Sequence, residues 1–244
     1  MPGGAWLILP TYNEIENVDL IVAAAREQLR RAVGEDFKIL IVDDGSPDGT
    51  GAAADRLAAQ DAHVEVLHRS EKSGIGPAYL AGFEHALRNG AALLMEMDAD
   101  FSHDPADLPR LIAAVTDGGA DLALGSRYVD GGGVTDWGLL RRIVSRGGSA
   151  YARVVLGLEI RDLTGGFKCF RSEVLEAIDF KTVRAHGYAF QVELTYRTLQ
   201  RGFRVVEVPI VFRDRQRGKS KMHWQIAAEA FWVLPQLRRP QRVQ

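Results

Sequence analysis

Short runs of apolar residues alternate along the first half of the chain with longer segments in which apolar positions recur every three or four residues. The runs have the length of strands, and the longer segments have the period of amphipathic helices. The predicted strands are 6–9, 37–42, 64–68, 93–98 and 121–125, and the predicted helices are 17–32, 52–60, 77–88 and 107–116. This alternation predicts right-handed crossovers and a mostly parallel central sheet flanked by helices, that is, an α/β fold.

The pattern changes after Asp130. Three glycines at 131–133 are followed by 139–158, which mixes arginines, small residues and aliphatic residues in one or more helices. We interpret 130–160 as a lid or acceptor-binding insertion rather than a separate domain. Beyond it, the sequence predicts a turn and strand over 163–171, a helix over 190–201, and a last strand over 205–212 that Pro209 marks as an edge.

The length of 244 residues and a hydrophobic content of 46% are typical of one domain with a substantial core. We expect this Rossmann-like domain to cover 1–218, and 219–244 to form an amphipathic helix and tail. The tail places Trp224 and Trp232 between basic residues. Such a segment either lies in a membrane interface or packs back onto the domain, and periodicity alone does not distinguish the two.

Charge and cysteine content narrow the functional classes. A net charge of −2 argues against nucleic acid as a partner, because the basic residues are only locally concentrated. The single cysteine, Cys169, cannot form an internal disulfide, and no signal-peptide pattern opens the chain, which indicates a cytoplasmic setting. No apolar run reaches the roughly 18 to 20 residues that cross a bilayer.

Candidate chemistry begins at Asp98-Ala99-Asp100, which closes the apolar run at 93–97. Residues i and i+2 of an extended segment point to the same side, so both carboxylates can face one crevice. Their mutual repulsion favours a divalent cation, and hard oxygen ligands suit Mg²⁺ or Mn²⁺ when substrate phosphates complete the coordination. The alternative is that these acids serve only as turn residues or helix N-caps.

Two other predicted strand ends also carry polar residues. Pro10 to Glu14 follow the strand at 6–9, and Asp43 to Thr50 follow the strand at 37–42. Ligands of such sheets bind beyond the carboxyl ends of the strands, so the three clusters predict a single site.

Five segments, in order along the chain, together resemble one known family, the dolichol-phosphate or polyprenol-phosphate mannose synthases. These are inverting family 2 glycosyltransferases with a GT-A fold, and the resemblance runs from about residue 6 to 221. The segments are Leu9-Pro10-Thr11-Tyr12-Asn13-Glu14, Val42-Asp43-Asp44-Gly45-Ser46-Pro47-Asp48-Gly49-Thr50, Asp98-Ala99-Asp100, Gly125-Ser126-Arg127 and Thr164-Gly165-Gly166-Phe167.

The resemblance implies a role for individual residues. For GDP-mannose it implies Pro10, Tyr12, Glu14, Val42, Asp44, Asp98, Ala99, Asp100, Arg127, Arg215 and Lys221; for the Mg²⁺ or Mn²⁺ ion, Asp98, Asp100 and Ser102; for the acceptor phosphate, Arg127, Arg141 and Ser145. Catalysis would fall to Asp100, Arg127, Arg215 and Lys221. Ser102 departs from the family, which usually has Gln there, and its short hydroxyl reaches a cation through water or not at all. Surface arginines that are simply solvated, and an Asp43 or Asp44 that only caps a helix, are the alternatives.

The implied reaction transfers mannose to a polyprenyl (dolichyl) monophosphate to give a β-linked product. The acceptor oxygen is already anionic, so it can attack without a general base, and His103 and His186 need no catalytic role. A lipid acceptor implies a protein peripherally associated with the cytoplasmic face of a membrane, attached through 222–234 or through a membrane-anchoring partner protein.

Competing functions differ in their sequence requirements. A dinucleotide oxidoreductase needs Gly-x-Gly-x-x-Gly where Pro10 to Glu14 stand, and a P-loop enzyme needs a glycine where Arg213 stands before Gly218-Lys219-Ser220. Two alternatives stay open: a related transferase that uses UDP-glucose or another sugar nucleotide, and a non-catalytic nucleotide-binding subunit.

Overall fold

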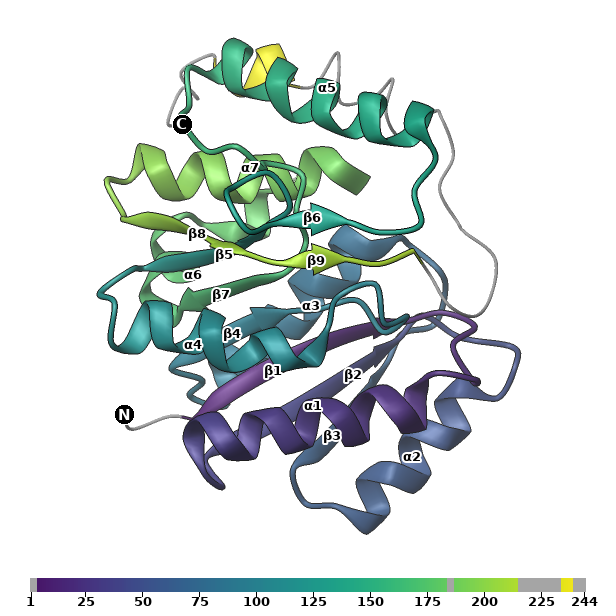
Figure 1. Cartoon of the computed structure of the whole chain (residues 1–244). Coiled ribbons are helices and arrows are strands. Elements are labelled where there is room, and N and C mark those ends of the chain that lie inside the picture. The colour runs from purple at the N-terminus through teal and green to yellow at the C-terminus, as the bar shows by residue number, and fades with distance from the viewer. Residues whose placement is uncertain (1–3, 184–186, 215–233, 239–244) are drawn as a thin grey trace.

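The computed structural model describes residues 4–183, 187–214 and 234–238, and it is built on a seven-stranded sheet (Figure 1). The strands, in the spatial order β3-β2-β1-β4-β7-β5-β8, are β3 (Val64–His68), β2 (Phe37–Asp43), β1 (Ala5–Thr11), β4 (Leu93–Glu96), β7 (Lys168–Arg171), β5 (Leu122–Ser126) and β8 (Val205–Pro209). Neighbouring strands are parallel except at β7, which runs antiparallel to both β4 and β5. The mostly parallel sheet predicted from the sequence is confirmed.

Helices cover both faces of this sheet. The first face packs on α1 (Val18–Val33), α2 (Thr50–Gln60) and α4 (Leu108–Thr116), and the second on α3 (Ile75–Arg88), α6 (Ser172–Ala177) and α7 (Gly187–Gln200). Alternate residues of β1 supply both cores, with Leu7 and Leu9 on the first face and Trp6 and Ile8 on the second. This two-sided burial explains why the parallel strands are nearly continuous apolar runs in the sequence.

The strand predicted over 93–98 is shorter in the structure. β4 ends at Glu96, so Asp98 and Asp100 lie in the turn that precedes the short 3-10 helix η1 (Pro105–Asp107). The prediction missed α6, the two-residue strand β6 (Gly133–Val134) and the 3-10 helix η2 (Phe180–Thr182).

The strand predicted over 205–212 is two strands in two sheets. Among the strands that the structure describes, β8 pairs with β5 alone and ends at Pro209, as expected of an edge strand, whereas β9 (Val211–Phe212) pairs with β6. The N–H of Ile210 still donates to Ser126 O of β5 at 3.0 Å, whereas its carbonyl accepts from the N–H of Gly133 of β6 at 2.9 Å. The chain therefore leaves the main sheet here.

The segment 130–160 contains β6 and α5 (Leu139–Leu156), and α5 is the outermost helix, lying across α7 at the top of Figure 1. A separate apolar cluster joins Ala152 and Leu156 of α5 to Val192 of α7 and to Leu234. The described end of the tail thus packs onto the domain, whereas 215–233 lies outside the described residues. Among the helices that the structure describes, none has the length and apolar character needed to span a membrane.

Candidate active site

A cavity of about 540 Å³ opens at the carboxyl ends of β1, β2, β4 and β5. The first turn of α3, α7, β9 and the glycine loop at 164–166 also line it. The residues expected from the sequence that line it are Pro10, Tyr12, Glu14, Asp44, Asp98, Ala99, Asp100, Ser102, Arg127 and Arg141. The three polar strand ends therefore meet in one space, as predicted.

Of the other expected site residues, two do not line this cavity and two lie outside the described residues. The side chain of Val42 is fully buried in the core beside α3. Ser145, on α5, hydrogen-bonds to the hydroxyl of Tyr128 at 2.6 Å. Arg215 and Lys221 fall outside the described residues, so their roles stay predictions.

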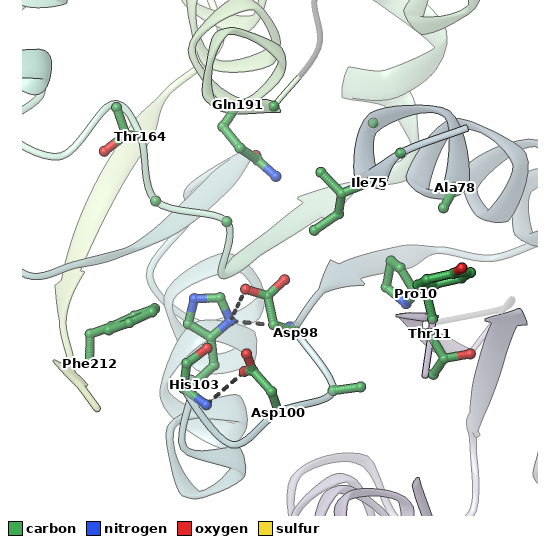
Figure 2. A pocket seen from close by; sticks show the side chains of 18 of the residues that line it. Pro10, Thr11, Ile75, Ala78, Asp98, Asp100, His103, Thr164, Gln191 and Phe212 are labelled. Carbon is green, nitrogen blue, oxygen red and sulfur yellow. Dashed lines mark hydrogen bonds and ion pairs between the residues drawn. The ribbon is translucent and has the colours of Figure 1, made fainter. Parts of the chain in front are cut away.

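The turn at 98–103 is held by hydrogen bonds that aim its two carboxylates into the cavity (Figure 2). The N–H of Ser102 donates to Asp100 Oδ1 at 3.0 Å, and the N–H of Asp98 donates to His103 Nδ1 at 3.2 Å. The hydroxyl of Tyr79, from α3, lies 3.4 Å from Asp98 Oδ1. The alternative that these acids only stabilise the turn does not account for both of them lining the cavity.

His103 is buried and stacked on Phe167, with the ring centres 4.9 Å apart. Burial lowers the pKa of His103 to about 4, so the ring is neutral at physiological pH. Because Nδ1 accepts from the Asp98 backbone, the proton lies on Nε2. The ring fixes the turn at 98–103 rather than carrying charge.

The donor set of this turn fits a divalent cation that a ligand helps to hold. Asp98 and Asp100 supply two hard oxygen donors, and the buried Ser102 Oγ has no hydrogen-bond partner among the described residues. Within the described chain, no cluster of three or more His, Cys, Asp or Glu side chains is arranged to hold a metal by itself. Phosphate oxygens of a ligand would therefore have to complete the coordination.

Adjacent acids at the end of β2 have different roles. Asp43 accepts from the Ser46 hydroxyl at 2.6 Å and the Ser46 N–H at 3.1 Å, so it stabilises the turn. Asp44 lines the cavity, where Arg69 holds its Oδ1 at 2.7 Å and the N–H of Ser73 approaches its Oδ2 at 3.3 Å. Neither acid caps α2, whose N-cap residue is Gly49: Asp43 holds the preceding turn, and Asp44 lines the cavity.

The sequence interpretation missed two features that attract anions at the same end of the cavity, the Lys72 side chain and the first turn of α3. The ammonium of Lys72 lies 4.3 Å from the centre of the Tyr12 ring. The first turn of α3, from Gly74 to Ala78, also lines the cavity, and N–H groups at a helix N-terminus attract anions. In the sequence, the only signal for this turn is the Gly74-Ile75-Gly76-Pro77 segment at the start of the helix predicted over 77–88.

Arg127 has a different partner from the one expected. Its Nη2 and Nε lie 2.6 and 2.7 Å from the two oxygens of Asp162, its backbone N–H donates to Asp162 at 2.9 Å, and Nη2 also reaches Thr164 at 2.8 Å. Asp162 is completely buried and Arg127 is 6% exposed. Asp162 thus supplies the buried carboxylate that a buried guanidinium requires, while Arg127 also lines the cavity, and its role toward an acceptor phosphate stays a prediction.

Arg141 is better placed to meet an acceptor. Its side chain is 32% exposed, lines the cavity, and stacks 4.3 Å from the centre of the Trp137 ring. Asp214 accepts one hydrogen bond from it at 2.7 Å. A guanidinium has five N–H donors, so this contact leaves donors for a phosphate.

A second buried charged pair lies beneath the cavity. Glu96 of β4 and Lys168 of β7 are register partners, and both are completely buried. Burial raises the pKa of Glu96 to about 7 and lowers that of Lys168 to about 8. The Lys168 charge and the Gln191 amide lower the pKa of Glu96 and so partly offset the effect of burial. Neither Glu96 oxygen has a partner in full hydrogen-bonding geometry among the described residues.

An α/β sheet with an acidic turn and a cavity of about 540 Å³ at its carboxyl edge is typical of nucleotide-dependent transferases. Comparison with known proteins specifies the family. The family model for glycosyl transferase family 2 matches residues 6–179. The chain belongs to glycosyl transferase family 2.

Two relatives match nearly the whole chain. The polyprenol monophosphomannose synthase of Mycolicibacterium smegmatis is 51% identical over 227 residues, which are 93% of this chain and 83% of the relative. The undecaprenyl-phosphate mannosyltransferase of Micrococcus luteus is 49% identical over 223 residues, which are 91% of this chain and 89% of the relative. By name, both relatives are enzymes.

Solved structures of glucosyl-3-phosphoglycerate synthase from Mycobacterium tuberculosis share the fold. The complex with phosphoglyceric acid has a TM-score of 0.70 at 18% identity, covering 97% of this chain and 80% of that one. The complex of the same enzyme with Mn²⁺, UDP-glucose and phosphoglyceric acid gives the same TM-score, identity and coverage. The GT-A fold expected from the sequence is thereby confirmed.

The Arg127–Asp162 pair generates a stability prediction. Arg127→Ala leaves Asp162 buried without a counter-charge, and we expect the free energy of unfolding to fall by about 3–5 kcal/mol. Urea denaturation followed by circular dichroism measures it. The control is Arg142→Ala, at an exposed arginine, for which a change within about 0.5 kcal/mol is expected. Equal effects of the two variants would contradict this assignment of Arg127.

Proposed function

We propose that the chain transfers mannose from GDP-mannose to the phosphate of a polyprenyl lipid, with inversion, to give a β-linked polyprenyl phosphate mannose. The observation that supports this proposal most directly is that Asp44, the acidic turn at 98–100 and Arg141 line one cavity. The names of two relatives at about half identity, a polyprenol monophosphomannose synthase and an undecaprenyl-phosphate mannosyltransferase, supply the substrate class.

The nucleoside would bind at the β1 and β2 end of the cavity. Asp44 can accept hydrogen bonds from guanine N–H or ribose hydroxyl groups, and Arg69 holds it in that orientation at 2.7 Å. Tyr12 offers an aromatic face with a polar tip. Glu14 is 5% exposed and lines the same end. Lys72 and the first turn of α3 suit the negative charge of the diphosphate.

Asp98 and Asp100 would hold the Mg²⁺ or Mn²⁺ ion together with the donor diphosphate, with Ser102 contributing directly or through water. When bound, the cation offsets the negative charge that develops on the departing GDP. The protein's own contribution is to fix both carboxylates through Ser102, His103 and Tyr79 before the ligand arrives. Arg215 and Lys221 are proposed to grip the diphosphate as well.

The acceptor phosphate would enter beside Arg141, under the segment 130–160, with Ser145 as a further contact. A monophosphate oxygen is anionic at neutral pH, so no side chain has to remove a proton from it. The site then has to align this oxygen opposite the departing diphosphate, and in-line displacement inverts the anomeric carbon. Arg127, which lines the cavity beside Asp162 and Thr164, is proposed to contact the acceptor phosphate and to take part in catalysis, as the resemblance implies.

A membrane-embedded acceptor requires peripheral association with the membrane, which we propose at its cytoplasmic face. α5 borders the cavity and exposes Ile143 and Val144 at 59% and 55% beside the exposed Arg142 and Arg146. Apolar residues flanked by arginines suit an anionic lipid surface. The segment 222–234 or a membrane-anchoring protein remains an additional proposed attachment.

A transfer assay tests the reaction. The purified chain is incubated with labelled GDP-mannose, polyprenyl phosphate and Mg²⁺ or Mn²⁺, and label is expected in the organic phase only when lipid and metal are both present. Faster transfer from UDP-glucose than from GDP-mannose would show that the transferred sugar is glucose and not mannose. Tight GDP binding without transfer from either donor would instead indicate a nucleotide-binding module.

Asp100→Asn keeps the Oδ1 that accepts from Ser102 but removes the charge. We expect transfer to fall about 10²–10³-fold, the scale of losing one electrostatic stabiliser of a leaving group. Initial rates over a Mn²⁺ titration measure it, with Asp117→Asn, at an exposed helix end, as the control. Unchanged rates at every Mn²⁺ concentration would remove Asp100 from the metal site.

Arg141→Ala and Arg142→Ala form a matched pair of neighbours on α5. Losing a hydrogen bond to a charged group lowers kcat/KM by about 10–100-fold. We expect this loss in kcat/KM for polyprenyl phosphate with Arg141→Ala and not with Arg142→Ala. The Kd of GDP, measured by calorimetry, should stay the same in both variants. Equal losses of acceptor use and GDP affinity in Arg141→Ala would contradict the acceptor role.

A further inference from the structure

Gln191 of α7 joins the cavity to the buried Glu96–Lys168 pair. It is 5% exposed and lines the cavity, where Figure 2 shows its side chain pointing from α7 into the space above Asp98 and His103. From behind, Lys168 Nζ donates to the Gln191 backbone carbonyl at 2.9 Å and also to its side-chain Oε1. The conformation of this side chain is therefore fixed by a charged group that no ligand touches.

The lysine also decides which end of the amide faces the cavity. An ammonium has only donors, so the atom that it contacts must be the amide oxygen. The amide nitrogen then lies on the cavity side, against the glycine loop, where a Cβ added to Gly166 would stand 3.3 Å from it. Nε2 carries two hydrogens, so a contact with Glu96 uses one and leaves the other for a ligand.

The pair that holds Gln191 has no evident purpose in packing. Glu96 and Lys168 are both at 0% exposure on facing positions of β4 and β7. Desolvating two charges offsets most of their attraction, and apolar residues of the same size usually serve a core equally well. What Lys168 provides, and an apolar residue would not, is a directed hydrogen bond to the Gln191 amide, while the charge of Glu96 favours the ammonium form of Lys168.

We propose that Gln191 is a specificity-determining residue whose Nε2–H donates to one hydroxyl of the transferred sugar, with Lys168 and Glu96 as its positioning pair. This inference rests on the proposed function, because it needs a hexose between the diphosphate and the acceptor. Gln191 lines the cavity together with Asp98 on the proposed diphosphate side and Thr164 on the Arg127 side. A fixed donor in this position favours sugars that present an oxygen to it.

A substrate–enzyme cycle tests the contact. Gln191→Met keeps the side-chain length and removes the donor, and kcat/KM is measured for GDP-mannose and for its 2-, 3-, 4- and 6-deoxy analogues. With GDP-mannose we expect a loss of about 10–100-fold. One deoxy analogue should already have a low kcat/KM with the unsubstituted chain, and Gln191→Met should not lower this kcat/KM further. The Kd of GDP should stay within about twofold.

Two outcomes would overturn the inference. If Gln191→Met loses the same factor with all five donors, it makes no contact with a sugar hydroxyl. If GDP affinity falls in parallel, the role of Gln191 is structural. Should the unsubstituted chain transfer glucose from UDP-glucose and no mannose, the proposed function fails, and the same cycle with deoxyglucose donors still decides the role of Gln191.

The positioning pair has its own test. Lys168→Met combined with Glu96→Gln removes both charges together, so neither is left buried alone. We expect this double variant to show the same loss with GDP-mannose and the same indifference to one deoxy analogue, with GDP binding retained. Adding Gln191→Met should cause no further loss, because the three residues act as a unit. Full additivity would exclude the positioning role.

Discussion

Where the strands of a parallel sheet end, the N–H groups of the following turns lose their ladder partners and must be satisfied by other groups. Here carboxylates do so: Asp43 accepts from the backbone N–H of Ser46, Asp48 from those of Ile15 and Thr50, Asp100 from that of Ser102, and Asp162 from that of Arg127. The acidic carboxyl edge is thus first a structural requirement. The site is made from the acids that also face the cavity.

This double use explains why neighbouring acids differ in role. Asp43 is consumed by the turn it stabilises, whereas Asp44 next to it is held by Arg69 and lines the cavity. Asp100 combines the two roles, since one oxygen accepts from Ser102 while the side chain lines the cavity. A turn built in this way holds the carboxylate oxygens that we propose as metal ligands in place before any ligand arrives, which lowers the entropy lost on binding.

Buried charged residues flank the cavity: the Arg127–Asp162 ion pair, and Lys168 with its register partner Glu96 beneath the proposed sugar position. Neither is an efficient source of stability, because desolvation offsets most of the attraction. Both, however, orient groups precisely where apolar residues would not. Glu207 extends the first network by accepting from the N–H groups of Arg161 and Asp162, so β8 helps to fix Arg127.

The sequence by itself determined the strands and helices of the first half, the parallel sheet and the three polar strand ends, because periodicity and turn chemistry are local properties. It also carried the family resemblance, through contiguous motifs such as Asp98-Ala99-Asp100. Only the tertiary structure decided that β7 runs antiparallel between β4 and β5, and that 205–212 divides between two sheets. It alone paired Arg127 with Asp162 and Gln191 with Lys168, because these partners are 35 and 23 residues apart and no local pattern links them.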